Sequence, residues 1–499
     1  MEVKFPKTMM KCLKPALREV QNQEQTQEIR LSDEMPDIGR VVGAWAQPIT
    51  RGKEWRGDSV GCSGGCMVWV MYVPEDGSQP RMLDSWIPFQ MKWNLPSSMP
   101  EGAAQIDCRV RFSDARSVSP RKILARVGLG ALAEAYVPME AEIPAAENLP
   151  QDVQLLRRAY PMQLPLELGE KVFTIEEEMQ LPSSAPALES VLSYGVTPRA
   201  TEQKVMSGRL LFRGDTNLHM LYLGEDGQVY SWDFELPFSQ LSQLDSEYGP
   251  DAQANMTLGV TELEVNRDED GKLRCKCSMV GQYRVTDRHN LELITDAYSP
   301  CRDVQPQMAE LELPAILDNS SMSLFGEQKL PVMANIAADT RFLPDFPRNT
   351  RTEAGFNSQL SGQLQMLYYD ENRHLQMASA QWEDNAQIPT GEDAKLYSNL
   401  QGMGRPDMTA GGDEVKLRWP MELMHTTMGG QGIPVVTGLQ MGEEKTPDPS
   451  RPSLILKHQT AGGLWELAKN SGSTMEAIRQ ANGLTEEPEI GTMLLIPVL

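Results

Sequence analysis

A five-residue apolar pattern that ends in tyrosine occurs three times along this chain, and its repetition constrains the fold more than any other feature. The three copies end at Tyr72, Tyr222 and Tyr368, which are 150 and 146 residues apart. Asp76-Gly77 follows the first copy and Asp226-Gly227 follows the second at the same distance, whereas the third has a weaker polar turn. Because an Asp-Gly pair after an apolar strand is a strong hairpin signal, each copy is predicted to contain a strand, a tight turn and a returning strand.

A second pattern recurs nearer the end of each copy and keeps nearly the same separation from the first. Apolar residues occupy every second position, which is typical of a strand with one face turned toward a core. We therefore expect Leu273, Cys275, Leu417 and Trp419 to point into their domains. The full set of matching positions is Ile123, Ala125, Val127 and Leu129 in the first copy, Leu273, Cys275, Cys277 and Met279 in the second, and Leu417, Trp419, Met421 and Leu423 in the third.

These repeats predict a mainly β protein of three antiparallel, sandwich-like domains followed by a small α+β module. The first domain, with an N-terminal extension, is expected over residues 1–150, the second over 151–305 and the third, most diverged domain over 306–441. The charged, proline-rich residues 442–452 are typical of a linker. Residues 453–499, which we call the C-terminal module, are predicted to contain a short strand, two short helices and a closing strand.

The net charge and the cysteine count restrict the partners and the compartment. The 499 residues include 46 Lys and Arg against 69 Asp and Glu, a net charge of −23, which argues against nucleic acid and anionic lipid as partners. No transmembrane segment is expected, because the longest apolar run is far shorter than the roughly 20 residues that are needed. Seven scattered cysteines, and an N-terminus interrupted by lysines and without a signal-peptide pattern, favour a cytoplasmic location.

No motif for catalysis or cofactor binding stands out, so we expect a protein that is not an enzyme and holds no cofactor. The five histidines do not pair at metal-ligand spacing, and His219 and His374 are expected at the surface. Cys275 and Cys277 fall on core positions of the second pattern. Cys62-x₃-Cys66 encloses two glycines in an expected loop, where a zinc ion would need two ligands from elsewhere, so no metal site is predicted.

Three groups of residues in the C-terminal module keep a specific spacing. They are Leu464-Trp465, then Asn482-Gly483-Leu484, and finally Gly491-x-x-Leu494-x-Ile496-Pro497. In this spacing the module resembles the LysM family. The resemblance implies a βααβ fold and a groove between two loops, which in that family generally binds glycans that contain N-acetylglucosamine.

The same resemblance places the candidate binding residues on the two loops. The family commonly has Gly-Asp-Thr before its Leu-Trp pair, where this chain has Ala461-Gly462-Gly463, and sugar recognition needs placed polar groups. A protein partner is therefore expected, with peptidoglycan as the alternative, and Gly463→Glu is expected to abolish binding without unfolding the module. Asn482 is expected either to cap a helix end or to donate to a ligand. The candidates are Ala461, Gly462, Gly463, Asn482, Gly483 and Leu484.

Short motifs in the first two repeats carry a second resemblance. Met35-Pro36-Asp37-Ile38, Ile87-Pro88-Phe89 and Ser119-Pro120-Arg121-Lys122 in the first repeat, and Pro237-Phe238 in the second, resemble the SPOCS-domain proteins of spore-forming bacteria. This resemblance implies a scaffold in the mother-cell cytoplasm, at the forespore surface, that the coat-basement morphogenetic ATPase recruits. The leading hypothesis is a non-enzymatic assembly scaffold of the spore coat or envelope, and the alternative is a cell-wall protein that binds N-acetylglucosamine glycans through its module.

Overall fold

A computed structural model of the chain shows long antiparallel strands and, among the residues it describes, two short helices. The structure describes residues 1–268, 272–334, 336–391, 393–401, 404–411, 413–429, 432–446 and 452–499. Within these residues, neither helix reaches the length and apolarity that crossing a bilayer demands.

The first and second repeats share one strand order, in which two sets of three antiparallel strands face each other. In the first repeat the sets are the sheets β3-β4-β5 and β2-β7-β6, and in the second they are the sheet β9-β10-β11 and the strands β8-β13-β12. A single residue pair, Gln163 with Ile316, joins the last set to strands of the third repeat in one seven-stranded sheet. The mainly β, sandwich-like prediction is therefore confirmed. The strands are β2 (Lys7–Arg30), β3 (Ile38–Trp55), β4 (Ser59–Pro74), β5 (Arg81–Asn94), β6 (Ala103–Ser119), β7 (Lys122–Pro144), β8 (Gln154–Met179), β9 (Leu188–Met206), β10 (Arg209–Gly224), β11 (Val229–Gln243), β12 (Gln253–Arg267) and β13 (Leu273–Tyr298).

The third repeat keeps this plan with interrupted strands. One sheet has β18 paired with β16, β17 and β19, and the other has β22 paired with β15, β20 and β21. Two further strands, β14 and β23, pair with each other and continue the course of β15 and β22. The strands are β14 (Arg302–Leu311), β15 (Ile316–Leu330), β16 (Ala337–Pro344), β17 (Arg348–Thr352), β18 (Gly355–Tyr369), β19 (Leu375–Pro389), β20 (Lys395–Gln401), β21 (Asp407–Gly411), β22 (Glu414–Met428) and β23 (Ile433–Glu444).

The strand ends differ from two of the expected domain limits. β14 crosses the limit between residues 305 and 306, because its residues pair with β23 of the third repeat, Gln305 opposite Gln440. β23 continues to Glu444, so the first three residues expected in the 442–452 linker lie in a strand. Residues 447–451 of that linker lie outside the described residues.

Each sandwich has its own core, built from the two recurring patterns. The twelve residues of the second pattern are all at most 3% exposed, and Leu273, Cys275, Leu417 and Trp419 point inward as expected. The hairpin prediction is also confirmed: Gly77 (φ 73°) and Gly227 (φ 79°) occupy the turns between the paired strands, where positive φ favours glycine.

The expected loop around Cys62 and Cys66 is wrong, because both cysteines lie buried within strand β4. The two glycines between them serve close packing rather than a turn. A Cβ on Gly65 would lie 2.3 Å from the Trp86 ring, and one on Gly64 would lie 2.1 Å from the carbonyl oxygen of Ile49. The two glycines thus let neighbouring groups pack closely against β4, although in the sequence they suggested a loop at this point.

The three sandwiches contact one another pairwise and form a closed ring. Strand β5 of the first repeat contacts β9 of the second, β11 contacts β16 of the third, and β19 contacts β3 of the first. We call these three interfaces the 1–2, 2–3 and 3–1 seams. Apolar residues from all three repeats meet at the centre, and they include Val42, Trp45, Trp69, Met71, Leu192, Leu221, Leu223, Val229, Ala338, Leu367 and Leu375.

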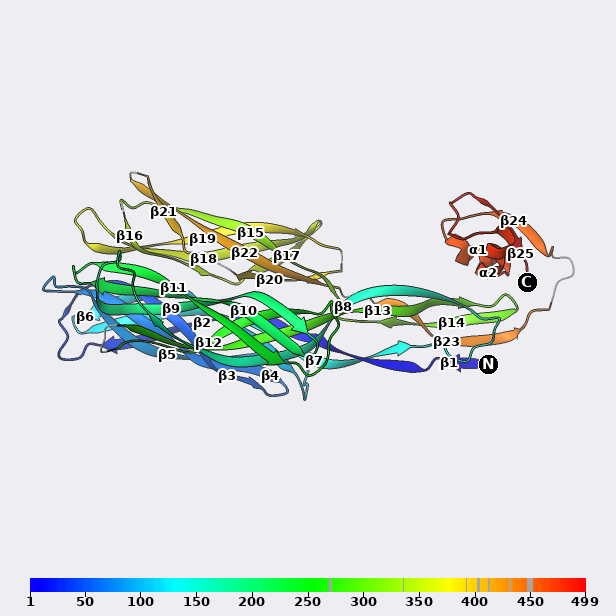
Figure 1. The fold of residues 1–499 in the computed structure, drawn as a ribbon, viewed down its shortest axis with the longest axis horizontal. Coiled ribbons are helices and arrows are strands. Elements are labelled where there is room, and N and C mark those ends of the chain that lie inside the picture. Colours follow the sequence, from blue (N-terminus) through cyan, green and yellow to red (C-terminus); the bar gives the residue numbers. More distant parts are fainter. Residues whose placement is uncertain are drawn as a thin grey trace.

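Beyond the sandwiches, three ribbons run together as a stalk, one from each repeat (Figure 1). They are the paired outer ends of β2 with β7, of β8 with β13, and β14 with β23. A short strand β1 (Glu2–Lys4) adds to β23. The stalk core is apolar and contains Phe5, Ala141, Leu164, Leu293, Ile294, Ala297, Leu311, Val435, Val436, Leu439 and Met441.

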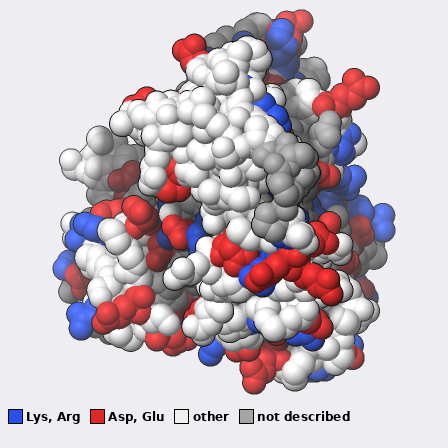
Figure 2. Space-filling model, turned by 90° about the vertical axis from the view of Figure 1, so that its right-hand side faces the viewer, with Lys and Arg blue, Asp and Glu red and all other residues white. Residues whose placement is uncertain are grey.

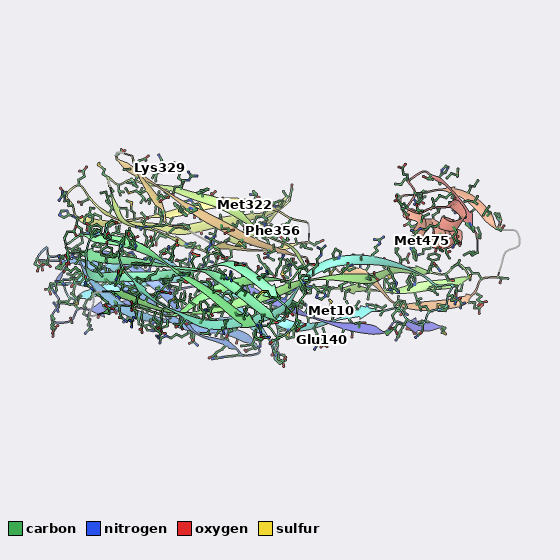
Figure 3. The ribbon with its side chains drawn as sticks, in the orientation of Figure 1. Met10, Glu140, Met322, Lys329, Phe356 and Met475 are labelled. Atoms are coloured by element: carbon green, nitrogen blue, oxygen red, sulfur yellow. The ribbon has the colours of Figure 1, made fainter. Side chains whose placement is uncertain are left out.

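The labelled residues in Figure 3 follow the long axis of the molecule. Met10 and Glu140 mark where the stalk of the first repeat begins, and Met322 and Lys329 lie progressively farther from the stalk along β15. Both chain ends and the C-terminal module lie at the far end of the stalk (Figure 1). The stalk therefore separates the module from the ring of sandwiches.

Candidate functional site

The C-terminal module has the βααβ order that its spacing predicted. It consists of β24 (Leu454–His458), α1 (Gly463–Ser471), α2 (Met475–Asn482) and β25 (Met493–Pro497). Thr474 caps α2, since its hydroxyl accepts the N–H of Ala477 at 3.1 Å. The core consists of Leu464, Trp465, Leu467, Ala468, Ile478, Leu494 and Ile496.

The two predicted loops lie side by side and are joined through Glu487. Its Oε1 accepts the backbone N–H of Leu464 at 2.8 Å and the Nε2 of Gln459 at 3.3 Å. The N–H of Gly463 donates to the carbonyl oxygen of Thr460 at 3.1 Å. The backbone N–H of Gly463, one of the candidate binding residues, is thus used inside the module, as is the N–H of Leu464.

Three of the six candidate residues, Asn482, Gly483 and Leu484, hold the module together. The Asn482 side chain donates to the carbonyl oxygens of Ile478 (2.8 Å) and Leu495 (2.6 Å), and its Oδ1 accepts the N–H of Leu495 at 2.8 Å. Gly483, at φ 62°, ends α2, and the N–H of Leu484 donates to the carbonyl oxygen of Arg479. The Asn482 amide therefore fastens α2 to β25 by bonds inside the module.

The other three candidates lie where α1 begins: Ala461 and Gly462 are exposed residues of the loop before the helix, and Gly463 is its first residue. Gly463 has φ 72°, and a Cβ there would lie 3.1 Å from Glu487 Oε1. A glutamate at position 463 would strain the backbone and place a second carboxylate beside Glu487. Gly463→Glu therefore combines a folding defect with any binding defect, contrary to the sequence-based expectation.

The structure reveals a different surface on the module, which we call the apolar sheet face. Leu454 (49% exposed) and Leu456 (63%) of β24 and Met493 (52%) of β25 are turned away from the core. Register places Leu456 opposite Leu495 and His458 opposite Met493, so the apolar groups are neighbours across the strand pair. Figure 2, which looks at this end of the molecule, shows a broad uncharged surface above groups of acidic side chains.

The sequence does hold a signal for this surface. A two-layer module should alternate apolar and polar residues along its outer strands, whereas Leu454, Ile455 and Leu456 are consecutive. Only Ile455 packs against the module core.

The opposite side of the module is fastened to the stalk through α1. Asp296, at the end of β13, accepts the indole N–H of Trp465 at 2.8 Å and pairs with Lys469 at 2.7 Å. Burial raises the pKa of Asp296, but Lys469 and the Trp465 hydrogen bond lower it by more, so the pKa lies below its usual value. The Tyr298 ring packs edge-on against Trp465, and its hydroxyl donates to the carbonyl oxygen of Ser473 at 3.0 Å. These contacts leave the apolar sheet face unobstructed.

The side chains that could bind a metal ion are dispersed over the described part of the chain, where no three His, Cys, Asp or Glu residues meet as such an ion would require. Cys62, Cys66, Cys275 and Cys277 are free thiols in buried positions. Burial raises the pKa of Cys66 to about 12 and that of Cys275 to about 11, which makes both poor nucleophiles.

Comparison with known proteins gives one match. Residues 188–267, from β9 to β12 of the second repeat, match the family described as SipL, SPOCS domain. No curated protein matches the chain, and no solved structure does. The chain thus contains a SPOCS domain, which indicates a sporulation-related protein.

Proposed function

We propose that this chain is a non-enzymatic scaffold of the bacterial spore coat or envelope, in which all three repeats are SPOCS domains. The observation that carries the proposal is the apolar sheet face, held at the end of a stalk by Asp296 and Tyr298. Exposed apolar groups gathered at one place mark a surface that binds another molecule. The ring of sandwiches and the stalk then act as a rigid spacer between this contact and the rest of the assembly.

The partner that this surface favours is a protein. Leu454, Leu456 and Met493 offer no hydrogen-bonding side chains for sugar hydroxyls, and apolar side chains at the centre of an interface contribute most to protein–protein affinity. We propose the coat-basement morphogenetic ATPase as that partner, with the protein acting in the mother-cell cytoplasm at the forespore surface. The internal hydrogen bonds of Glu487 and Asn482 favour this partner over peptidoglycan.

Leu456→Asp tests the proposal on the full chain. A buried carboxylate at the centre of the contact would have no partner, so affinity for the purified ATPase should fall by at least about thirtyfold, equivalent to about 2 kcal/mol. Biolayer interferometry measures the affinity. The matched control is Val172→Asp, because Val172 is as exposed (62%) but lies on β8 in the second repeat.

The control variant should bind like the natural protein. Equal affinities for the ATPase in the Leu456→Asp and natural chains would remove the apolar sheet face from the interface. Strong, saturable sedimentation of the chain with insoluble peptidoglycan, lost in neither variant, would instead favour the cell-wall alternative.

A further inference from the structure

The two strands of the C-terminal module, β24 and β25, form an antiparallel pair that no further described strand joins. In such a pair, alternate residues bond to the partner strand, and the residues between them turn their N–H and carbonyl groups to the opposite side. The N–H of Gln459, directly after β24, donates to the carbonyl oxygen of Thr492 at 2.8 Å. Every second residue before it, Lys457 and Ile455, therefore bonds to β25, and the even-numbered residues of β24 turn their backbone groups away from β25.

The outer edge of β25 is closed by a side chain. Leu495 turns its backbone groups to this edge, where its N–H donates to Asn482 Oδ1 at 2.8 Å and its carbonyl oxygen accepts Asn482 Nδ2 at 2.6 Å. The Asn482 side chain thus takes the place of a further strand, because an amide offers the same donor and acceptor as the backbone. A strand cannot be added on this side without displacing Asn482.

The outer edge of β24 is open. The backbone groups of its outward-turned residues have no hydrogen-bond partner among the described residues. These residues are Leu454, Leu456 and His458. The devices that commonly protect an edge strand are missing: β24 contains no proline, its register with β25 has no bulge, and Lys457 Nζ is held by Ser471 Oγ at 3.0 Å. An open, regular edge is a template for a further strand.

The apolar sheet face adjoins this edge and sets which side chains an added strand would carry. Side chains that point to one face of a sheet lie side by side on neighbouring strands. An added strand would therefore place every second side chain beside Leu454 and Leu456, which are 49% and 63% exposed. Apolar residues at those positions would remove both leucines from water.

Charge complementarity defines one end of the added strand. Glu489 lies in the turn before β25, where its carbonyl oxygen accepts the N–H of Thr492 at 3.1 Å, and Thr492 in turn bonds to Gln459 at the end of β24. Glu486 and Glu489 are exposed and form no ion pair with any described residue. A basic residue at this end of an added strand would therefore meet free carboxylates, on a chain whose net charge is −23.

We propose that an extended segment of the protein partner pairs with β24 as a third strand of the module's sheet. The segment is apolar at every second residue and basic at the end near His458. This inference rests on the proposed function and deepens it by assigning the chemistry of the contact. Backbone hydrogen bonds to the open edge supply affinity, and the alternate side chains on the apolar sheet face supply specificity.

Proline at position 456 tests the backbone contact in the full chain. Leu456→Pro removes the outward N–H but no hydrogen bond inside the module, whereas the matched variant Leu456→Ala keeps the N–H and loses only the side chain. The affinity of Leu456→Pro for the purified ATPase should be lower than that of Leu456→Ala by about tenfold. Biolayer interferometry measures both affinities, and circular dichroism checks that both variants keep the fold.

Hydrogen–deuterium exchange of the natural chain tests the same contact without a variant. Mass spectrometry with electron-transfer fragmentation resolves single amides. In the free chain the outward amides should exchange faster than those of Ile455 and Lys457, because they have no acceptor. In the complex with the ATPase they should become protected, since they then donate to the added strand. The outward amides are those of Leu454, Leu456 and His458.

Three results would overturn the strand pairing. They are equal affinities of Leu456→Pro and Leu456→Ala, rapid exchange of the outward amides in the complex, and a dimer of the natural chain that Leu456→Pro abolishes, which would assign the edge to a second copy. If Leu456→Asp still lowered the affinity for the ATPase, the scaffold contact would stand without the added strand. Failure of the natural chain to bind the ATPase would instead overturn the proposed function and the strand pairing together.

Discussion

Replacing Trp419 with alanine is expected to lower the free energy of unfolding by about 3–5 kcal/mol, because it removes one of the largest fully buried side chains in the protein. The Trp419 ring packs against Phe342 and Trp382 at centroid distances of 4.7 and 5.5 Å. Gly326 on the paired strand β15 leaves room for the ring, since a Cβ there would lie 2.2 Å from it. Alanine would leave a cavity that these rigid neighbours cannot fill. Chemical denaturation followed by circular dichroism measures the loss.

Phe325→Ala is the matched control for this change. Phe325 also lies on β15, but its side chain is 58% exposed and points away from the sandwich core. Its removal should alter the free energy of unfolding by no more than about 1 kcal/mol. If the two variants lost equal stability, Trp419 could not be the centre of the third core, and the alignment of the three repeats would be in error.

The sandwiches could be predicted from the sequence because burial in a two-sheet fold imposes a period of two on each strand. Ile123, Leu273 and Leu417 open the same inward-facing pattern in the three repeats, and all are at most 2% exposed. The two hairpin turns could also be predicted from the sequence, because Gly77 and Gly227 adopt the positive φ that an Asp-Gly hairpin needs. These signals are local, and each acts within a few residues of its own position.

The stalk and the seams could not be predicted, because their contacts join residues far apart in the chain. Leu293 and Ile294 are adjacent in β13, yet both are at most 2% exposed, since ribbons from the other repeats cover both faces. His219 was expected at the surface, and this was wrong: it does point away from its own sandwich, but the third repeat covers most of it, and its side chain is only 18% exposed. Only His374 lies at the surface as expected.

The C-terminal module, too, could be predicted only where its structure depends on residues that are close together in the sequence. The caps and core of the C-terminal module follow from short-range spacing, and Thr474 and Gly483 act as that spacing indicates. Its binding surface depends instead on which side of the module faces the stalk. That side is fixed by Asp296 and Tyr298, more than 160 residues before α1, so the sequence pattern favoured the two loops over the apolar sheet face.

A cluster of charged side chains, of which Asp339 is fully buried and the others are partly exposed, joins the second repeat to the third at the 2–3 seam. His219 lies between two carboxylates, with its Nδ1 2.7 Å from Asp233 and its Nε2 3.0 Å from Asp339. Arg405 pairs with both carboxylates, at 3.4 Å from Asp233 and 3.2 Å from Asp339, and Arg341 adds a further positive charge to the field of Asp339. Two contacts to carboxylates favour the imidazolium form, which has a donor on each ring nitrogen.

The pKa values in this cluster are shifted in opposite directions. Burial disfavours the charged form of His219, but the attraction of Asp339 and the hydrogen bond to Asp233 outweigh it, so its pKa lies above the usual value of 6.5. Burial raises the pKa of Asp339, but His219 and the arginines lower it by more, so that its pKa lies below 3.8. The histidine contribution to stability is therefore complete below about pH 6.5 and is lost as pH rises through the elevated pKa. The carboxylate contribution is lost on the acidic side, as pH falls through the lowered pKa.

Asp339→Asn is accordingly expected to destabilise the chain by about 2–3 kcal/mol at mildly acidic pH, because it removes the buried carboxylate that faces the half-buried His219 and Arg341 and leaves only Asp233 beside the histidine. The dependence on pH separates this electrostatic effect from a packing defect.

His219→Gln places in the 2–3 seam the residue that the third repeat has naturally at Gln365, and it removes only the titrating group. Denaturation midpoints of His219→Gln and of the natural chain, measured from pH 5 to 9, should differ most at acidic pH. They should converge as the pH rises and His219 of the natural chain loses its proton. Parallel pH profiles for the two proteins would show that the imidazolium does not hold the second and third repeats together, and the seam would then depend on its apolar centre at Leu221 and Ala338.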